Sequence, residues 1–143
     1  MLDSRSPGQA WAPHPPACPL CDQVEENIQH ILISCVFARQ IWTLIFQKLD
    51  LLTFAPQRSN TRFSGWWCGT IKGVPRDSRK GLNSLIILVA WELWKHRNAC
   101  VFEGARPVVE VMLQSVANES NLWCLAGASA LHEFLARSWV LDS

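Results

Sequence analysis

The sequence predicts a mainly α-helical fold: a small Cys3His zinc knuckle, followed by a helical hairpin or bundle of three to four helices. Two observations lead to this prediction. Over much of the chain, apolar residues recur at three- and four-residue steps, which is the spacing of one helix face. Near the N-terminus, cysteine and histidine residues have the spacing of a zinc site. No run of alternating apolar and polar residues indicates a half-buried strand.

The first two segments differ sharply in composition. Residues 1–17 contain four of the eight prolines, so we expect a disordered, proline-rich leader. Residues 18–52 are expected to form the zinc knuckle and one amphipathic helix that ends before Pro56. The apolar positions of that helix are Phe37, Ile41, Leu44, Ile45, Leu49 and Leu52.

The remaining chain divides into a basic segment and a helical region. Residues 53–77 hold two prolines and three glycines and show no sustained period, so we expect a basic loop with at most a short helix or turn near Phe63, Trp66 and Trp67. Residues 78–143 are expected to be helical. The first helix covers 78–103, the second runs from about Pro107 to about 125, and the third covers 129–139. Gly104 and Gly127 follow the first two of these helices, where a terminating glycine is common.

Composition excludes several classes of protein. With 143 residues, 49% apolar and 17% charged, the chain is too apolar to be wholly disordered. Its formal net charge is only +1, but the charge is unevenly distributed. Residues 36–80 carry eight Lys or Arg against two acids, whereas residues 1–35 carry one against four and residues 81–143 four against six. The basic middle of the chain is therefore the part that could attract polyanions.

No export or membrane signal is apparent in the sequence. The first 16 residues lack an apolar h-region, and the most apolar run, residues 85–91, is far shorter than the roughly 20 residues of a spanning helix. We therefore expect an intracellular protein without a membrane partner, and the sequence does not decide between nucleus and cytoplasm. In a reducing compartment, cysteines serve as metal ligands or buried thiols more often than as disulfides.

The segment CPLCDQVEENIQHILISC has the spacing C-x2-C-x8-H-x4-C, formed by Cys18, Cys21, His30 and Cys35. Three thiolates and one imidazole suit a tetrahedral zinc ion, and four protein ligands make such a site structural. His30 lies in a segment with helical character, and Cys35 follows about 140° further around an ideal helix. Both can therefore reach one ion only if Cys35 lies at or beyond the helix end.

Two alternatives to a zinc site stay open at this point. The pair Cys18 and Cys21 could be a redox dithiol, although that motif belongs to a βαβ context. The thiols could also be buried and unlinked. Cys68, Cys100 and Cys124 are interpreted as core thiols, and His14, His96 and His132 as ordinary polar residues.

The segment from Cys18 to Trp42 resembles the zinc-binding domain that follows the polymerase in plant non-LTR (LINE-type) reverse transcriptases. The shared pattern comprises the four Cys and His residues together with Glu26, Ala38, Arg39 and Trp42. Further along, WELWKHRNACVFEG is similar to a Trp-x-x-Trp, Arg-Asn, Phe segment of such elements, through Trp91, Trp94, Arg97, Asn98 and Phe102. The resemblance implies one structural zinc ion and a fragment of a retroelement, or a gene derived from one.

We expect no enzymatic activity. The polymerase of such elements has paired aspartates, which this sequence lacks, and two-metal nucleases need clustered carboxylates. The function predicted instead is binding of RNA or single-stranded DNA, in which cations neutralise phosphates and aromatic rings stack on bases. The candidate contacts are Arg39, Arg58, Arg62, Trp66, Trp67, Lys72, Arg76, Arg79 and Lys80.

Three other interpretations accompany nucleic-acid binding. Trp66 and Trp67 could be core residues, and the cations could be solvated surface. The chain could be a scaffold that binds a protein partner or a second copy of itself, since eight tryptophans and the apolar helix over 78–103 exceed what a chain of this size readily buries. It could also be a retroelement remnant without a function.

Overall fold

A computed structural model describes residues 18–21 and 27–138, and in this part of the chain all regular structure is helical. The predicted leader over residues 1–17 lies outside the described residues. The mainly α-helical fold class is confirmed. In chain order the elements are the π-helix η1 (His30–Ser34), α1 (Val36–Lys48), η2 (Leu52–Phe54), α2 (Phe63–Gly73), η3 (Arg76–Ser78), α3 (Arg79–Phe102), α4 (Val109–Leu125) and α5 (Ser129–Ser138).

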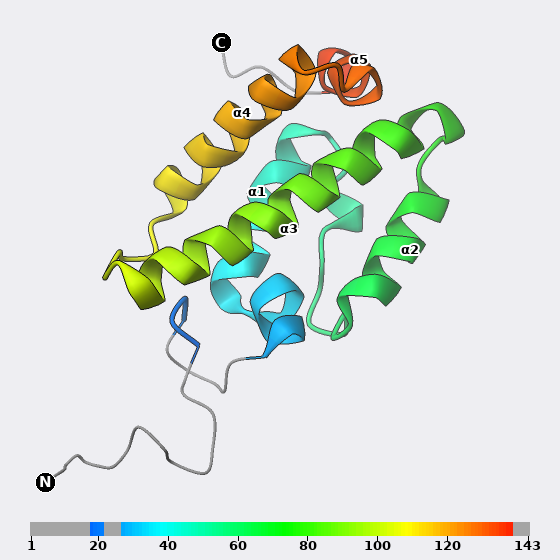
Figure 1. Cartoon of the computed structure of the whole chain (residues 1–143). Helices are drawn as coiled ribbons and strands as arrows, with labels where there is room; N and C mark the ends of the chain where they lie inside the picture. The colour runs from blue at the N-terminus through cyan, green and yellow to red at the C-terminus, as the bar shows by residue number, and fades with distance from the viewer. Residues whose placement is uncertain (1–17, 22–26, 139–143) are drawn as a thin grey trace, which may run out of the picture.

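Helix α3 is the central element of the fold. It contacts α2, α4, α5 and η1, and Figure 1 shows it crossing the middle of the molecule with α4 and α2 on either side. Its buried apolar residues are Leu82, Leu85, Ile86, Leu88, Val89 and Leu93. Such a wide apolar surface is expected for a helix that packs against neighbours on several sides. Within the described residues, no helix is both long enough and apolar enough to cross a bilayer.

The ends of α3 and α4 coincide with the predicted glycines. Gly104 and Gly127 have φ values of 70° and 111°, a region that residues with a Cβ adopt only with strain. Each glycine therefore lets the chain leave its helix and reverse direction. The bounds of α3, α4 and α5 lie within about two residues of those that the hydrophobic periodicity predicts.

Helix α1 ends earlier than its apolar pattern predicts. The pattern runs to Leu52, but the helix stops at Lys48. Asp50 adopts a left-handed conformation with φ of 59°, and the Leu51 N–H donates to the Phe46 carbonyl at 2.9 Å. The chain thus closes the helix with a Schellman-type turn, for which an aspartate substitutes for the usual glycine.

The prediction for residues 53–77 was a basic loop with at most a short helix near Phe63, Trp66 and Trp67, and the structure shows that the helix there is longer than expected. This segment contains α2, an α-helix of 11 residues. Its buried residues Phe63, Trp66 and Thr70 follow a helical spacing, but Gly65, Gly69 and Gly73 lower the intrinsic helix propensity of the segment. Tertiary packing of the aromatic face therefore decides the conformation.

Aromatic side chains from α1 and α2 form the core between these helices. The ring of Trp42 lies 4.8 Å from that of Trp66 and 6.1 Å from those of Phe46 and Phe63, measured between centroids. The indole N–H of Trp66 donates to the Phe54 carbonyl at 2.8 Å, so its burial leaves no donor unsatisfied.

Candidate metal centre

Four potential metal ligands converge beside η1. The Sγ atoms of Cys18, Cys21 and Cys35 and a ring nitrogen of His30 all lie within 4.8 Å of one another. The Cys18 and Cys35 sulfurs are 3.9 Å apart, and Cys21 Sγ is 3.2 Å from His30 Nε2. Two sulfurs bound to one zinc ion are separated by about 3.8 Å, given Zn–S bonds of about 2.3 Å and tetrahedral geometry. The Cys18 and Cys35 sulfurs thus have the separation of two sulfurs on one zinc ion, and the other two donor atoms lie close enough to share that ion.

Backbone and side-chain hydrogen bonds position His30 and Cys35. The Asn27 side chain accepts a hydrogen bond from the His30 N–H at 2.9 Å, as a helix-capping residue does. The Cys35 N–H donates to the His30 carbonyl at 2.7 Å, an i to i+5 bond of the π-helical type. Cys35 itself has left the helix, with φ −62° and ψ 138°. The requirement that Cys35 lie at or beyond the helix end is confirmed.

Helix α1 holds η1 in place through two side chains. The Arg39 guanidinium donates to the Ser34 carbonyl from Nη2 at 2.7 Å and from Nε at 3.2 Å. The Trp42 indole donates to the Leu32 carbonyl at 2.8 Å. These bonds satisfy carbonyl groups at the end of η1 that have no helical partner of their own.

A third contact joins the metal centre to α2. The side-chain oxygen of Gln29 accepts a hydrogen bond from the Phe63 N–H at 2.6 Å. Phe63 is the first residue of α2, where N–H groups lack intrahelical acceptors. The segment that contains His30 and Cys35 is therefore hydrogen-bonded to two helices, α1 and α2.

Burial distinguishes this group from a redox dithiol. Cys18 and Cys35 are completely buried, and His30 is 8% exposed. Burial raises the pKa of the Cys18 thiol and raises that of Cys35 to about 12. A reactive dithiol needs the opposite, a thiolate stabilised at neutral pH. Zinc, which displaces thiol protons directly, fits two buried sulfurs, one half-buried sulfur and one imidazole better.

The predicted nucleic-acid contacts fall into different environments. Five cations are exposed along or near α2: Arg58, Arg62, Lys72, Arg76 and Lys80. Arg39, on α1, is half-buried and donates to the Ser34 carbonyl at the end of η1. Arg79 is also half-buried, and it donates to the carbonyls of Val74 and Lys72. These two arginines therefore have structural roles that the sequence did not reveal.

The two tryptophans among the predicted contacts also differ. Trp66 is only 6% exposed, so it is a core residue, as the alternative interpretation of the sequence had it. Trp67 is half-buried, and its indole donates to the Asn83 side chain at 2.8 Å. Trp66 is therefore not accessible for stacking with a nucleic-acid base, and only part of the Trp67 ring is exposed.

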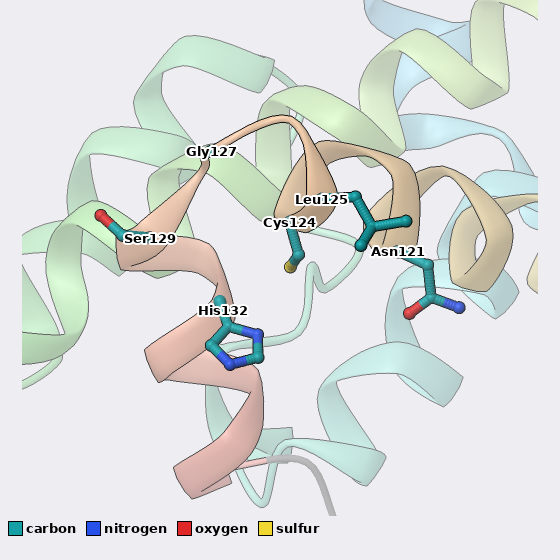
Figure 2. A pocket seen from close by; sticks show the side chains of 6 residues that line it. All are labelled: Asn121, Cys124, Leu125, Gly127, Ser129 and His132. Atoms are coloured by element: carbon teal, nitrogen blue, oxygen red, sulfur yellow. The ribbon is translucent and has the colours of Figure 1, made fainter.

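A separate hollow lies beside the turn between α4 and α5. Its volume is about 570 Å³. Figure 2 shows three of its lining residues, Cys124 and Leu125 at the end of α4 and His132 on α5. Asn121, Gly127 and Ser129 complete the lining. None of these residues belongs to the Cys3His group, so the hollow is distinct from the metal centre.

The sequence did not predict the side chains whose hydrogen bonds hold the segment of the candidate ligands in place. Asn27 stands three residues before His30, which is the spacing of an N-capping side chain, so this contact had a recognisable signal. The hydrogen bonds made by Gln29 and Trp42 join residues distant in the sequence and have no such local signal.

A comparison with known protein families matches the part of the chain that holds the four candidate metal ligands. Residues 5–42 match the family model described as zinc-binding in reverse transcriptase. The matched range includes the four candidate ligands and also Arg39 and Trp42, which hold η1 against α1. No curated protein and no solved structure matches the chain.

Proposed function

We propose that this chain is a non-catalytic module that zinc stabilises and that binds single-stranded nucleic acid. The match of residues 5–42 to the family model described as zinc-binding in reverse transcriptase supports the zinc part of this proposal. Cys18, Cys21, His30 and Cys35 would hold one structural zinc ion. The exposed cations along α2 would contact the phosphates of RNA or single-stranded DNA. The observation that supports the metal part most strongly is the convergence of four buried or half-buried donor atoms within 4.8 Å.

The donor set supports a structural role for the metal. Four protein ligands fill a tetrahedral zinc site and leave no coordination position for water or substrate. The three thiolates and the imidazole come from two short segments, 18–21 and 30–35, which one metal ion would join directly. Metal affinity would then contribute directly to the folding of this part of the chain.

Exposed positive charge supports nucleic-acid binding. Residues 58–80 carry six Lys or Arg against one acid, Asp77. Five of the six cations are exposed, as described above. Cations that neutralise phosphates release condensed counterions, so the affinity for a single strand should fall as salt rises, with a slope of about −0.7 per phosphate contact.

The test is a salt titration of binding. Fluorescence anisotropy of a labelled oligouridylate would be measured between about 50 and 200 mM salt, with the zinc-loaded chain. We expect measurable binding and a steep negative dependence of affinity on salt. Binding that does not change with salt, or no binding at about 50 mM, would contradict the nucleic-acid part of the proposal.

A second candidate function is protein docking through α3. Two of its residues one turn apart, Ile87 and Trp91, are 41% and 51% exposed. Exposed apolar residues at helical spacing are typical of a face that a protein partner covers. Sedimentation of the chain alone, over a range of concentrations, would show whether a second copy covers this face, and Trp91→Ser would abolish that association.

A further inference from the structure

Helix α2 presents an outer face that the described part of the chain leaves uncovered except at Gly73, beside Phe54. Its inner residues Phe63, Trp66 and Thr70 are buried. On the opposite side, all the residues described as exposed are small except for one lysine: Ser64, Gly65, Cys68, Gly69, Lys72 and Gly73. The face is therefore flat, and its helical backbone lies close to the surface.

The fold does not explain two of the glycines on this face. A Cβ at Gly69 would meet no atom within 4 Å, and a Cβ at Gly65 would only touch the Arg62 Cβ at 4.0 Å. Gly73 differs, because a Cβ there would lie 2.5 Å from Cε1 of Phe54. Glycine inside a helix lowers its stability relative to alanine, so Gly65 and Gly69 weaken α2 without improving the packing of this chain.

Positive charge flanks the same face at both ends. Arg58 and Arg62 are exposed before the first turn of α2, and Lys72, Arg76 and Lys80 are exposed at and after its last turn. Arg79 connects the second group to α2, since it donates to the Lys72 and Val74 carbonyls at 3.0 and 3.2 Å. The 11 residues of α2 separate the two groups by about 16 Å.

We propose that the sugar–phosphate backbone of a single strand runs along the outer face of α2, passing over Gly65 and Gly69 between the two groups of cations. This inference rests on the nucleic-acid binding proposed above. It adds the surface that the strand contacts and the path of the strand along α2. The charge of the two cation groups complements the phosphates at either end. The absence of side chains between them lets the strand approach the helix closely.

A substitution at Gly69 separates contact from stability. Gly69→Leu places a side chain in open space and introduces a better helix former, so the melting temperature should not fall. Its affinity for an oligouridylate should fall about tenfold or more, because the side chain occupies the path of the strand. Ala117→Leu is the matched control, an exposed position on α4 away from this face, and it should bind as the parent does.

A charge variant distinguishes this inference from the function on which it rests. In Arg62→Gln with Lys72→Gln, the salt slope should flatten by about 1.4, from two lost contacts of about 0.7 each. If the charge variant binds weakly but Gly69→Leu binds like the parent, the path over α2 is wrong and the proposed function stands. If the parent does not bind the oligonucleotide, both fail.

A protein partner on this face is a further outcome of the test. Self-association of the parent that Gly69→Leu abolishes, with unchanged oligonucleotide binding, would overturn the inference in favour of a second copy of the chain. All samples would contain a reductant, because Cys68 is exposed on the same face and could form an intermolecular disulfide.

Discussion

The Arg39 guanidinium and the Trp42 indole stabilise the zinc-binding segment without being candidate ligands. Both donate to carbonyl groups of η1, and both belong to the range that matches the family model described as zinc-binding in reverse transcriptase. Arg39 is half-buried, and its two hydrogen bonds converge on Ser34, the residue before the ligand Cys35. We therefore interpret Arg39 as a residue that positions Cys35, in place of the phosphate contact that its charge suggested.

Replacing Arg39 tests this role. Arg39→Met removes both donors and leaves the Ser34 carbonyl unsatisfied, so we expect a loss of about 1–3 kcal/mol in the free energy of unfolding, measured by urea denaturation of the zinc-loaded chain. Arg62→Met, at an exposed cation, should change it by less than about 0.5 kcal/mol. Unchanged stability of Arg39→Met together with weaker oligonucleotide binding would restore Arg39 as a phosphate contact.

The buried thiols make zinc binding dependent on pH. Because burial raises the pKa values of Cys18 and Cys35, both are protonated at neutral pH without metal. Zinc binding must release these two protons, and a lower pH opposes their release. The release of these two protons alone lowers the zinc affinity about 100-fold for each unit of decrease in pH near neutrality, so we expect a fall of at least that size. Competition with a chromophoric chelator would measure this, and a dependence of less than tenfold per unit would exclude the two thiols as ligands.

At the scale of elements, the helical hairpin of α3 and α4 and the final helix α5 were predictable from local signals. Their apolar residues follow helical spacing, and Gly104 and Gly127 mark where two of the helices end. The grouping of the four candidate ligands was predictable for the same reason, because their spacing lies within 18 residues of sequence. That they bind zinc stays a prediction. What local signals miss are contacts made across the fold.

Helix α2 and helix η1 show why the rest could not be predicted. The three glycines of α2 argue for a loop, and only its packing against Trp42 and Phe46 makes the segment helical. The π-helix η1 is fixed by side chains of α1, since Arg39 and Trp42 donate to its carbonyl groups, and neither periodicity nor propensity encodes these contacts. In both cases tertiary contacts determine the local structure.

Gly81 tests how closely α3 and α5 pack. A Cβ at this position would lie 2.6 Å from the Ala130 carbonyl oxygen and would clash with Cβ of Phe134. Gly81→Ala should therefore separate the helices and lower the free energy of unfolding by about 1–3 kcal/mol. Gly69→Ala, where the added methyl group meets nothing, should instead raise it by up to about 1 kcal/mol. Equal effects of the two substitutions in thermal denaturation would contradict the described packing of α5.

At the scale of the whole molecule, the metal centre is continuous with the hydrophobic core. Cys18, Leu20 and Ile33 are buried in the same cluster as the apolar residues of α1 and α3. The proposed zinc ion would therefore fix the N-terminal segment onto the helical body at the point where η1 contacts α1 and α3. The outer face of α2, which points away from the core, stays available for a ligand.

The central claim is that three sulfurs and one imidazole of this chain bind one zinc ion. X-ray absorption spectroscopy at the zinc edge of the purified protein tests it directly. The account predicts three sulfur neighbours at about 2.3 Å and one nitrogen at about 2.0–2.1 Å. A coordination shell made only of nitrogen and oxygen, or a protein that retains no zinc, would contradict it.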